Sequence, residues 1–195
     1  MGALATVAYD GGIMESYPMQ LGGMESVSVT TAGFDNLCGL YLTVLEDLWN
    51  TDNGLNSDIT ELGIDLSQTR LSQSEQAAVA WAFGQYTGLS PIQGTFEELA
   101  EQGYLTSEPL GDNPDGPQFW QWEDGCLFSI REQEDPVVFS LPAMETGTAS
   151  TQYDGVRFDA EKWRSGLGAY IFSDCTAVSV DGFWNSYTIG SEAIS

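Results

Sequence analysis

The sequence contains no histidine, and only 5 of its 195 residues are basic. The absence of imidazole removes the commonest general base, the usual partner of a catalytic serine or cysteine, and a ligand of most zinc sites. Five cations are too few to neutralise the phosphates of a nucleic acid or to hold an anionic membrane surface. We therefore expect neither nucleic acid nor a charged lipid surface as a direct partner.

Long apolar runs are also absent. No window offers the roughly 20 apolar residues that a membrane-spanning helix needs. The first ten residues have neither the basic start nor the apolar stretch of a secretory signal. The glycine-rich loops that bind phosphate groups are missing as well. The sequence therefore predicts no membrane span, no signal peptide and no bound organic cofactor.

Cysteine is scarce, and the three that occur leave one unpaired in any intramolecular scheme. Cys38 falls in an apolar helical pattern and is expected in the core. Cys126 and Cys175 fall in strand-like stretches, and the sequence leaves open whether they form a disulfide. A catalytic cysteine is not expected, because no imidazole is present to form its thiolate pair.

Acidic residues dominate what charge there is, with 29 Asp and Glu against 5 Lys and Arg and a formal net charge of −24. Self-repulsion destabilises such a chain in dilute buffer, whereas at about 1 M salt the Debye length falls to about 3 Å. The acids are dispersed along the chain rather than gathered in a tail. This composition resembles that of proteins from halophilic archaea and their viruses, which implies adaptation to concentrated salt. An acidic marine protein or an acidic binding module is the alternative.

Length and composition predict one domain over 1–195, because 42% apolar and 12% aromatic residues exceed what disordered chains contain. In 1–33, alternation over 24–30 and paired glycines predict an extended arm or a pair of strands. Residues 34–105 are predicted to be helical and 106–195 β-rich. The expected fold class is α+β, with an N-terminal extended arm, a helical hairpin region and a C-terminal antiparallel sheet or small barrel.

Spacing and capping signals locate the helices. Apolar residues at three- and four-residue intervals from Phe34 to Trp49 predict the first helix. Two more helices are expected to begin at capping boxes and to end at glycines, namely Ser72 with Glu75 and Gly88, and Thr95 with Glu98 and Gly103. These two helices are predicted to form the helical hairpin.

Turn signals punctuate the β-rich part. Asp124-Gly125 separates 119–122 from 126–130 and predicts a β-hairpin, and Tyr153–Phe158 is a second candidate. Asp181-Gly182 predicts a later turn.

A polar cluster after the first helix is a candidate cation site. Asp52, Asn56, Asp58 and Glu61 supply oxygen ligands near a glycine, which hard cations such as Ca²⁺ and Mg²⁺ prefer. The spacing is not that of an EF-hand, so a polar turn is the alternative. Loosely bound cations around carboxylates are the only cofactor that the composition suggests.

Two aromatic clusters invite functional hypotheses. Trp120 and Trp122 beside Glu123 and Asp124 suit a carbohydrate site with paired carboxylates, and they equally suit the core or interface of a sheet.

The second cluster holds two of the five cations around a tryptophan, as Lys162, Trp163 and Arg164. A salt bridge to an acidic neighbour or a subunit contact is predicted there, with a local ion pair as the alternative. Trp120 and Trp122 are further candidates for the interface.

No catalytic constellation emerges, so we predict a structural or interaction subunit of a larger assembly in a halophilic system. The specific hypothesis is a virion component of a haloarchaeal virus, such as a capsid decoration, turret, portal adaptor or tail protein. Its expected partners are protein subunits in a homo- or hetero-oligomer, and its expected location is the virion or the cytoplasm of the host. The alternatives are a carboxylate-based hydrolase and a surface or ligand-binding module of a halophile.

Overall fold

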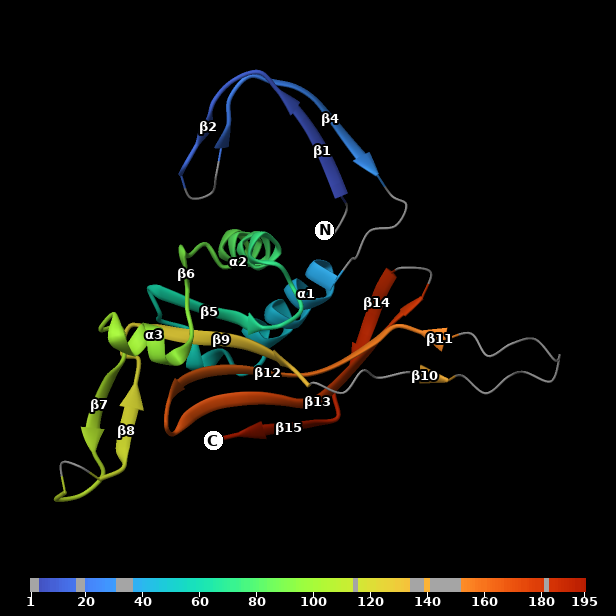
Figure 1. Cartoon of the computed structure of the whole chain (residues 1–195). Helices are drawn as coiled ribbons and strands as arrows, with labels where there is room; N and C mark the ends of the chain where they lie inside the picture. The colour runs from blue at the N-terminus through green and yellow to red at the C-terminus, as the bar shows by residue number, and fades with distance from the viewer. Residues whose placement is uncertain are drawn as a thin grey trace.

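A long mixed sheet organises the fold, and two helices cover one of its faces (Figure 1). The computed structural model describes residues 4–16, 20–30, 37–113, 116–133, 139–140, 152–180 and 183–195. Within these ranges the architecture is α+β, as predicted, with α-helices, a sheet of nine strands and three small two-stranded sheets.

The N-terminal part forms a β-ribbon. Strand β1 (Leu4–Tyr9) pairs antiparallel with β4 (Met24–Thr30), and the short strands β2 (Ile13–Met14) and β3 (Gln20–Leu21) pair beyond them. Gly11 is required here, because a Cβ atom at that position would lie 2.5 Å from the backbone of Gly22. In the described residues β1 and β4 pair only with each other, so the ribbon adds no strand to the main sheet.

The nine strands of the main sheet come from the rest of the chain. In chain order they are β5 (Glu61–Gln68), β6 (Pro91–Gln93), β7 (Thr106–Pro109), β8 (Gln118–Gln121), β9 (Gly125–Glu132), β12 (Gly155–Ser165), β13 (Gly168–Val180), β14 (Phe183–Thr188) and β15 (Ser191–Ile194). The order across the sheet is β14-β13-β12-β9-β5-β6. In addition, β15 pairs with β13, β8 pairs with β12, and β7 pairs with β8. Strands β10 (Phe139–Ser140) and β11 (Gln152–Tyr153) form a separate pair.

The main core lies between the sheet and the two longer helices, α1 (Leu37–Asn50) and α2 (Gln73–Thr87). Both predicted features of α2 are confirmed. The Ser72 side chain accepts from the Glu75 amide to complete the capping box, and Gly88 ends the helix at φ +78°. Successive side chains of β9 point to opposite faces of the sheet, so Cys126, Phe128 and Ile130 belong to this core whereas Leu127 belongs to another.

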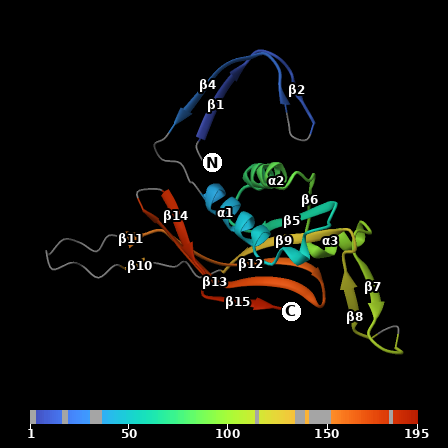
Figure 2. The same ribbon diagram turned by 180° about the vertical axis from the view of Figure 1, so that it is seen from behind.

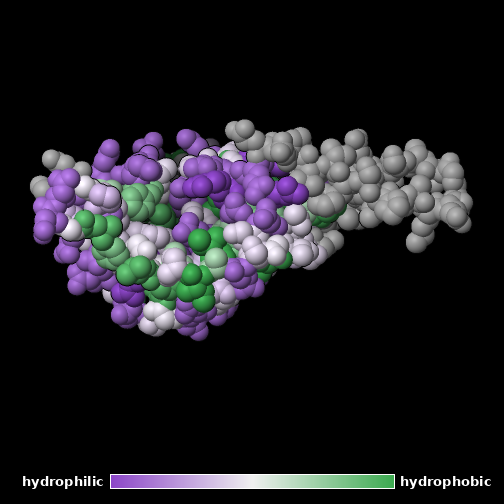
Figure 3. All heavy atoms as spheres, turned by 90° about the horizontal axis from the view of Figure 1, so that it is seen from below, coloured by the Kyte–Doolittle hydropathy of each residue, from purple (hydrophilic) through white to green (hydrophobic). Residues whose placement is uncertain are grey.

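A second, smaller core lies on the opposite face of the sheet. Helix α3 (Phe96–Glu101) begins at the predicted capping box of Thr95 and Glu98 and packs Leu99 against Leu127 and Trp122. Helix α3, the strands β7 and β8 and the turn from β12 to β13 lie at the same end of the sheet (Figures 1 and 2). Seen from below, the surface has hydrophobic patches set among hydrophilic residues (Figure 3).

The predicted C-terminal antiparallel sheet or small barrel is correct only in part, because the main-sheet strands of 106–195 pair antiparallel with one another but the sheet as a whole does not follow this pattern. β5 pairs parallel with both β6 and β9, which makes the sheet mixed, and within the described residues the sheet does not close into a barrel. Strands β5 and β6 also fall inside 34–105, which the sequence predicted to be helical. β5 is a central strand buried on both faces and lacks the alternation that reveals a half-buried strand.

The predicted hairpins are also corrected. Helices α2 and α3 do not form a helical hairpin, because Pro91 begins the extended strand β6 between them and α2 packs against α1. The residues on either side of Asp124-Gly125 belong to β8 and β9, which pair with other strands and not with each other. Tyr153–Phe158 is split between β11 and β12, while Asp181-Gly182 lies outside the described residues. The long hairpin that does form joins β12 to β13.

Candidate functional site

The polar loop predicted to bind a cation surrounds an ammonium group of the protein itself. The loop follows α1 and contains the short 3₁₀ helix η1 (Asn53–Leu55). The Nζ atom of Lys162 donates to the carbonyl oxygens of Thr51 and Asp52, the latter at 2.9 Å, and to Oδ1 of Asn56 at 2.8 Å. Lys162 is fully buried on β12, and burial lowers its pKa. The only lysine of the chain therefore neutralises the negative end of the α1 dipole.

The other two predicted metal ligands, Asp58 and Glu61, accept hydrogen bonds from different side chains. Arg164 donates through Nη1 to Oδ1 of Asp58 at 2.6 Å, and this bond lowers the pKa of the Asp58 carboxyl group. Glu61 accepts from Nε1 of Trp122 at 2.6 Å. Within the described residues, no three Asp, Glu or Cys side chains are grouped so as to hold a metal ion. A metal bound by Asp52, Asn56, Asp58 and Glu61 stays a prediction.

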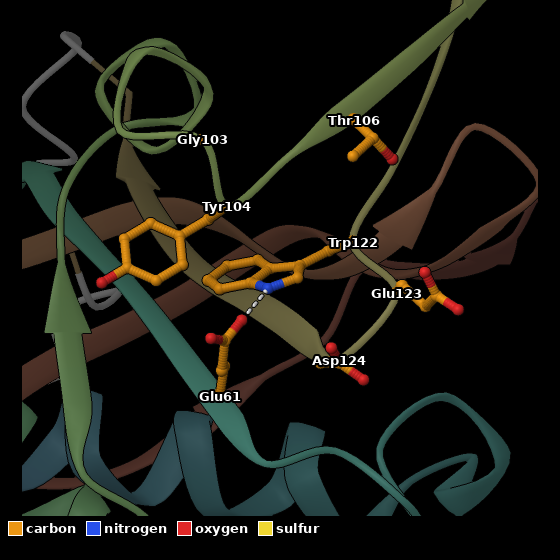
Figure 4. A pocket seen from close by; sticks show the side chains of 7 residues that line it. All are labelled: Glu61, Gly103, Tyr104, Thr106, Trp122, Glu123 and Asp124. Atoms are coloured by element: carbon orange, nitrogen blue, oxygen red, sulfur yellow. Dashed lines mark hydrogen bonds between the residues drawn. The ribbon is translucent and has the colours of Figure 1, made fainter.

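A cleft of about 220 Å³ opens beside Trp122 at the start of β5 and β9 (Figure 4). Its lining residues are Glu61, Gly103, Tyr104, Thr106, Trp122, Glu123 and Asp124. The Trp122 and Tyr104 rings lie 5.7 Å apart between centroids, and the Glu61 carboxylate meets the edge of the indole. Sequence reasoning placed Trp122, Glu123 and Asp124 together, and the structure adds Glu61 from another strand.

Two glycines make room for the wall of this cleft. A Cβ atom at Gly125 would lie 2.2 Å from the Trp122 ring, and one at Gly63 would lie 2.6 Å from it. The buried indole therefore requires glycine on β5 and on β9. The turn carrying Glu123 and Asp124 is fixed as well, because Nη2 of Arg164 donates to the Glu123 carbonyl at 2.7 Å. The cleft is thus held in place before any ligand binds.

The remaining predicted interface residues pack inside the protein. Trp163 lies on the face of β12 opposite Lys162, and its ring centroid is 5.0 Å from that of Phe96. Trp120 contacts the same Phe96 ring at 5.5 Å. Both tryptophans are only partly buried, whereas Trp122 is almost fully buried. Their role in a subunit interface stays a prediction.

The N-terminal ribbon exposes apolar side chains that the sequence analysis did not single out. Large apolar residues are 39–62% exposed on it, namely Tyr9, Ile13, Met14, Leu21, Met24 and Val27. Their pattern along 24–30 showed a strand, but nothing in the sequence told which face was uncovered. Helix α2 carries two more exposed aromatic residues, Trp81 and Tyr86.

The three cysteines are buried, and Cys126 and Cys175, whose pairing the sequence left open, are two separate thiols. Burial raises the pKa of each of these two thiols to about 12. Both are therefore protonated and inert at neutral pH.

Comparisons with protein-family models, with curated proteins and with solved structures find no match. Among the described helices, none has both the length and the apolar character needed to cross a bilayer. The function is therefore inferred from the cleft beside Trp122 and from the exposed surface of the chain.

Proposed function

We propose that this chain is a structural or interaction subunit of a larger assembly in a high-salt system and that its N-terminal ribbon attaches it to a neighbour. A virion component of a haloarchaeal virus is the specific form of this proposal, with protein subunits as partners. The observation that supports it is the ribbon of 4–16 and 20–30, whose exposed apolar side chains include Ile13, Met14 and Met24.

An isolated two-stranded ribbon is at best marginally stable in water. Fully burying a large apolar side chain stabilises by about 1.5–3 kcal/mol, so completing the burial of a half-exposed one contributes about 1 kcal/mol. Because successive side chains point to opposite faces of a strand, a partner on one face buries about three of the six and contributes about 3 kcal/mol toward holding the ribbon. The strongly acidic surface supports the same setting, because concentrated salt screens the repulsion between subunits.

The test is the light-scattering mass of the full chain in about 2 M salt, where the Debye length is under about 3 Å. We expect a defined multiple of 21.1 kDa. The double variant Ile13→Ser/Met24→Ser should reduce that mass to one chain without changing the melting temperature of the main sheet and its helices. Leu167→Ser is the matched control, since Leu167 is 79% exposed in the β12–β13 turn. A wild-type monomer at this salt concentration contradicts self-assembly.

The cleft favours a second candidate function, a hydrolase that uses carboxylates on a neutral substrate such as a carbohydrate. Glu61, Glu123 and Asp124 line one cleft with Tyr104 and Trp122. Glycoside hydrolases use a pair of carboxylates, and aromatic side chains beside them suit a sugar ring. An anionic substrate would be repelled by these three acids.

The assay is the release of reducing ends from neutral oligosaccharides in about 2 M salt, the screened regime. Glu61→Gln and Glu123→Gln should each abolish turnover, while Glu97→Gln on the exposed side of α3 should leave it unchanged. Equal activity in all three variants contradicts a role for the cleft.

A further inference from the structure

Helix α2 lies in the stretch of the sequence that is without charge for longest, in a protein whose charged residues are mostly acidic. The chain has 29 acidic and 5 basic residues in 195, which is one charge about every six positions, yet none occurs in 76–96. This stretch covers α2 after its first turn and the edge strand β6. Carboxylates keep the rest of the surface hydrated in salt, so a face that lacks them is suited to contact with protein.

The outer face of α2 also carries exposed side chains in a regular row. Ala78, Trp81 and Gln85 are exposed at intervals of three and four residues, so they form one stripe along the helix. Trp81 stands among small neighbours and is 41% exposed. Tyr86 beside it is 47% exposed and is held in place, since its hydroxyl group accepts from Nδ2 of Asn50 at 2.8 Å. A projecting tryptophan next to a fixed tyrosine is typical of an interface anchor.

We infer that this outer face of α2 receives the N-terminal ribbon of a second copy of the chain. The inference rests on the proposed function and names the partner surface. The ribbon contains three acids, Asp10, Glu15 and Glu25, and no base. Any acidic face would repel it, whereas the α2 face adds no charge against it. Both surfaces are apolar, and both are uncovered in the structure.

We assign the ribbon to a second copy because, within one chain, the outer face of α2 and the apolar side chains of the ribbon do not cover each other. The ribbon lies beyond α2 on the same side of the molecule (Figures 1 and 2), yet Trp81 and the ribbon side chains Met24 and Val27 remain exposed with the ribbon in that position. Two copies that exchange ribbons make the same contact twice around a two-fold axis. Such an isologous arrangement closes and leaves neither surface free.

Cross-linking distinguishes the partner. Ala78→Cys and Met24→Cys place exposed thiols on the α2 face and on the ribbon, while the three native cysteines are buried. Chains of the two variants are mixed in about 2 M salt, where repulsion is screened, and treated with a short bis-maleimide. We expect a covalent product of twice 21.1 kDa that each variant alone forms several-fold less. When both substitutions are in one chain, a product at 21.1 kDa that is linked internally overturns the inference, because the ribbon then docks on its own α2.

A second variant separates this inference from the proposed function. Trp81→Glu should reduce the mass to a single chain, and Leu167→Glu, which adds the same charge at the exposed β12–β13 turn, should not. If Trp81→Glu keeps the assembly, the α2 face is not the receptor, while the proposal of an assembly subunit stands. If the wild-type chain is a monomer in about 2 M salt, where like-charge repulsion is screened, both fail together.

Discussion

Substitution of the buried lysine tests whether the loop after α1 depends on it. Lys162→Met keeps most of the apolar stem and removes the ammonium, which donates to Asn56 and to the carbonyls of Thr51 and Asp52. Hydrogen bonds from a charged donor contribute about 1.5–3 kcal/mol each, or about 4–9 kcal/mol for three. The ammonium costs several kcal/mol to bury, which offsets part of this sum. We expect the free energy of unfolding to fall by about 3 kcal/mol, or about 6–12 °C in Tm for a chain of this length.

The measurement is thermal and denaturant unfolding, followed by tryptophan fluorescence and calorimetry, with Arg131→Met as the matched control. Arg131 is exposed on the neighbouring strand β9 and, within the described residues, forms no ion pair within 4.0 Å. The control removes the same unit charge, and its effect should stay within about 0.5 kcal/mol. Equal stability of Lys162→Met and Arg131→Met would refute the reasoning, because solvent would then satisfy the loop carbonyls as well as the lysine does.

Three other predictions concern the thiols, the salt and the second core. The native protein should resist maleimide at neutral pH and bind three equivalents when unfolded. Because burial raises the pKa of the Cys126 thiol to about 12, against about 8.5 in an unfolded chain, the free energy of unfolding should fall as pH rises above about 8.5. The melting temperature should rise steeply from dilute to molar salt, and a flat profile would contradict salt adaptation. Trp163→Ala should cost about 2–3 kcal/mol by removing the contact with Phe96 at 5.0 Å. If the assembly mass falls instead, Trp163 is an interface residue.

Local signals in the sequence predicted the features that local chemistry determines. The capping boxes at Ser72 and Thr95 form as expected, because a side chain and an amide three residues apart are sufficient to make them. The left-handed stop at Gly88 is local in the same sense. The α+β class also follows from such signals and is confirmed, whereas the part predicted to be helical contains the strands β5 and β6 as well.

The sequence did not predict which distant segments pair with each other. β5 lies parallel to β9, which begins more than 60 residues later, and no turn residue encodes that register. The same limit applies to the sites. Glu61 was grouped with its neighbours in sequence as a metal ligand, whereas it reaches Trp122 across the fold. The oxygen-rich loop was predicted to bind a metal ion, which stays a prediction, and the structure shows that it accepts hydrogen bonds from Lys162, more than 100 residues away.

Three of the few cations join segments that are distant in the sequence, and of these three Lys162 is the one that is fully buried. Arg70 joins the end of β5 to Glu132 of β9 at 2.7 Å, Arg164 joins the loop of Asp58 to the turn of Glu123, and Lys162 holds the end of α1. Ions of the solvent screen repulsion at the surface, but they do not enter the buried cage of Lys162. Salt should therefore raise the stability of the wild type and of Lys162→Met in parallel and leave the difference between them constant. A difference that vanishes at high salt would mean that a solvent cation occupies the cage in place of the ammonium, and the loop of Asp52 and Asn56 would then be a cation site.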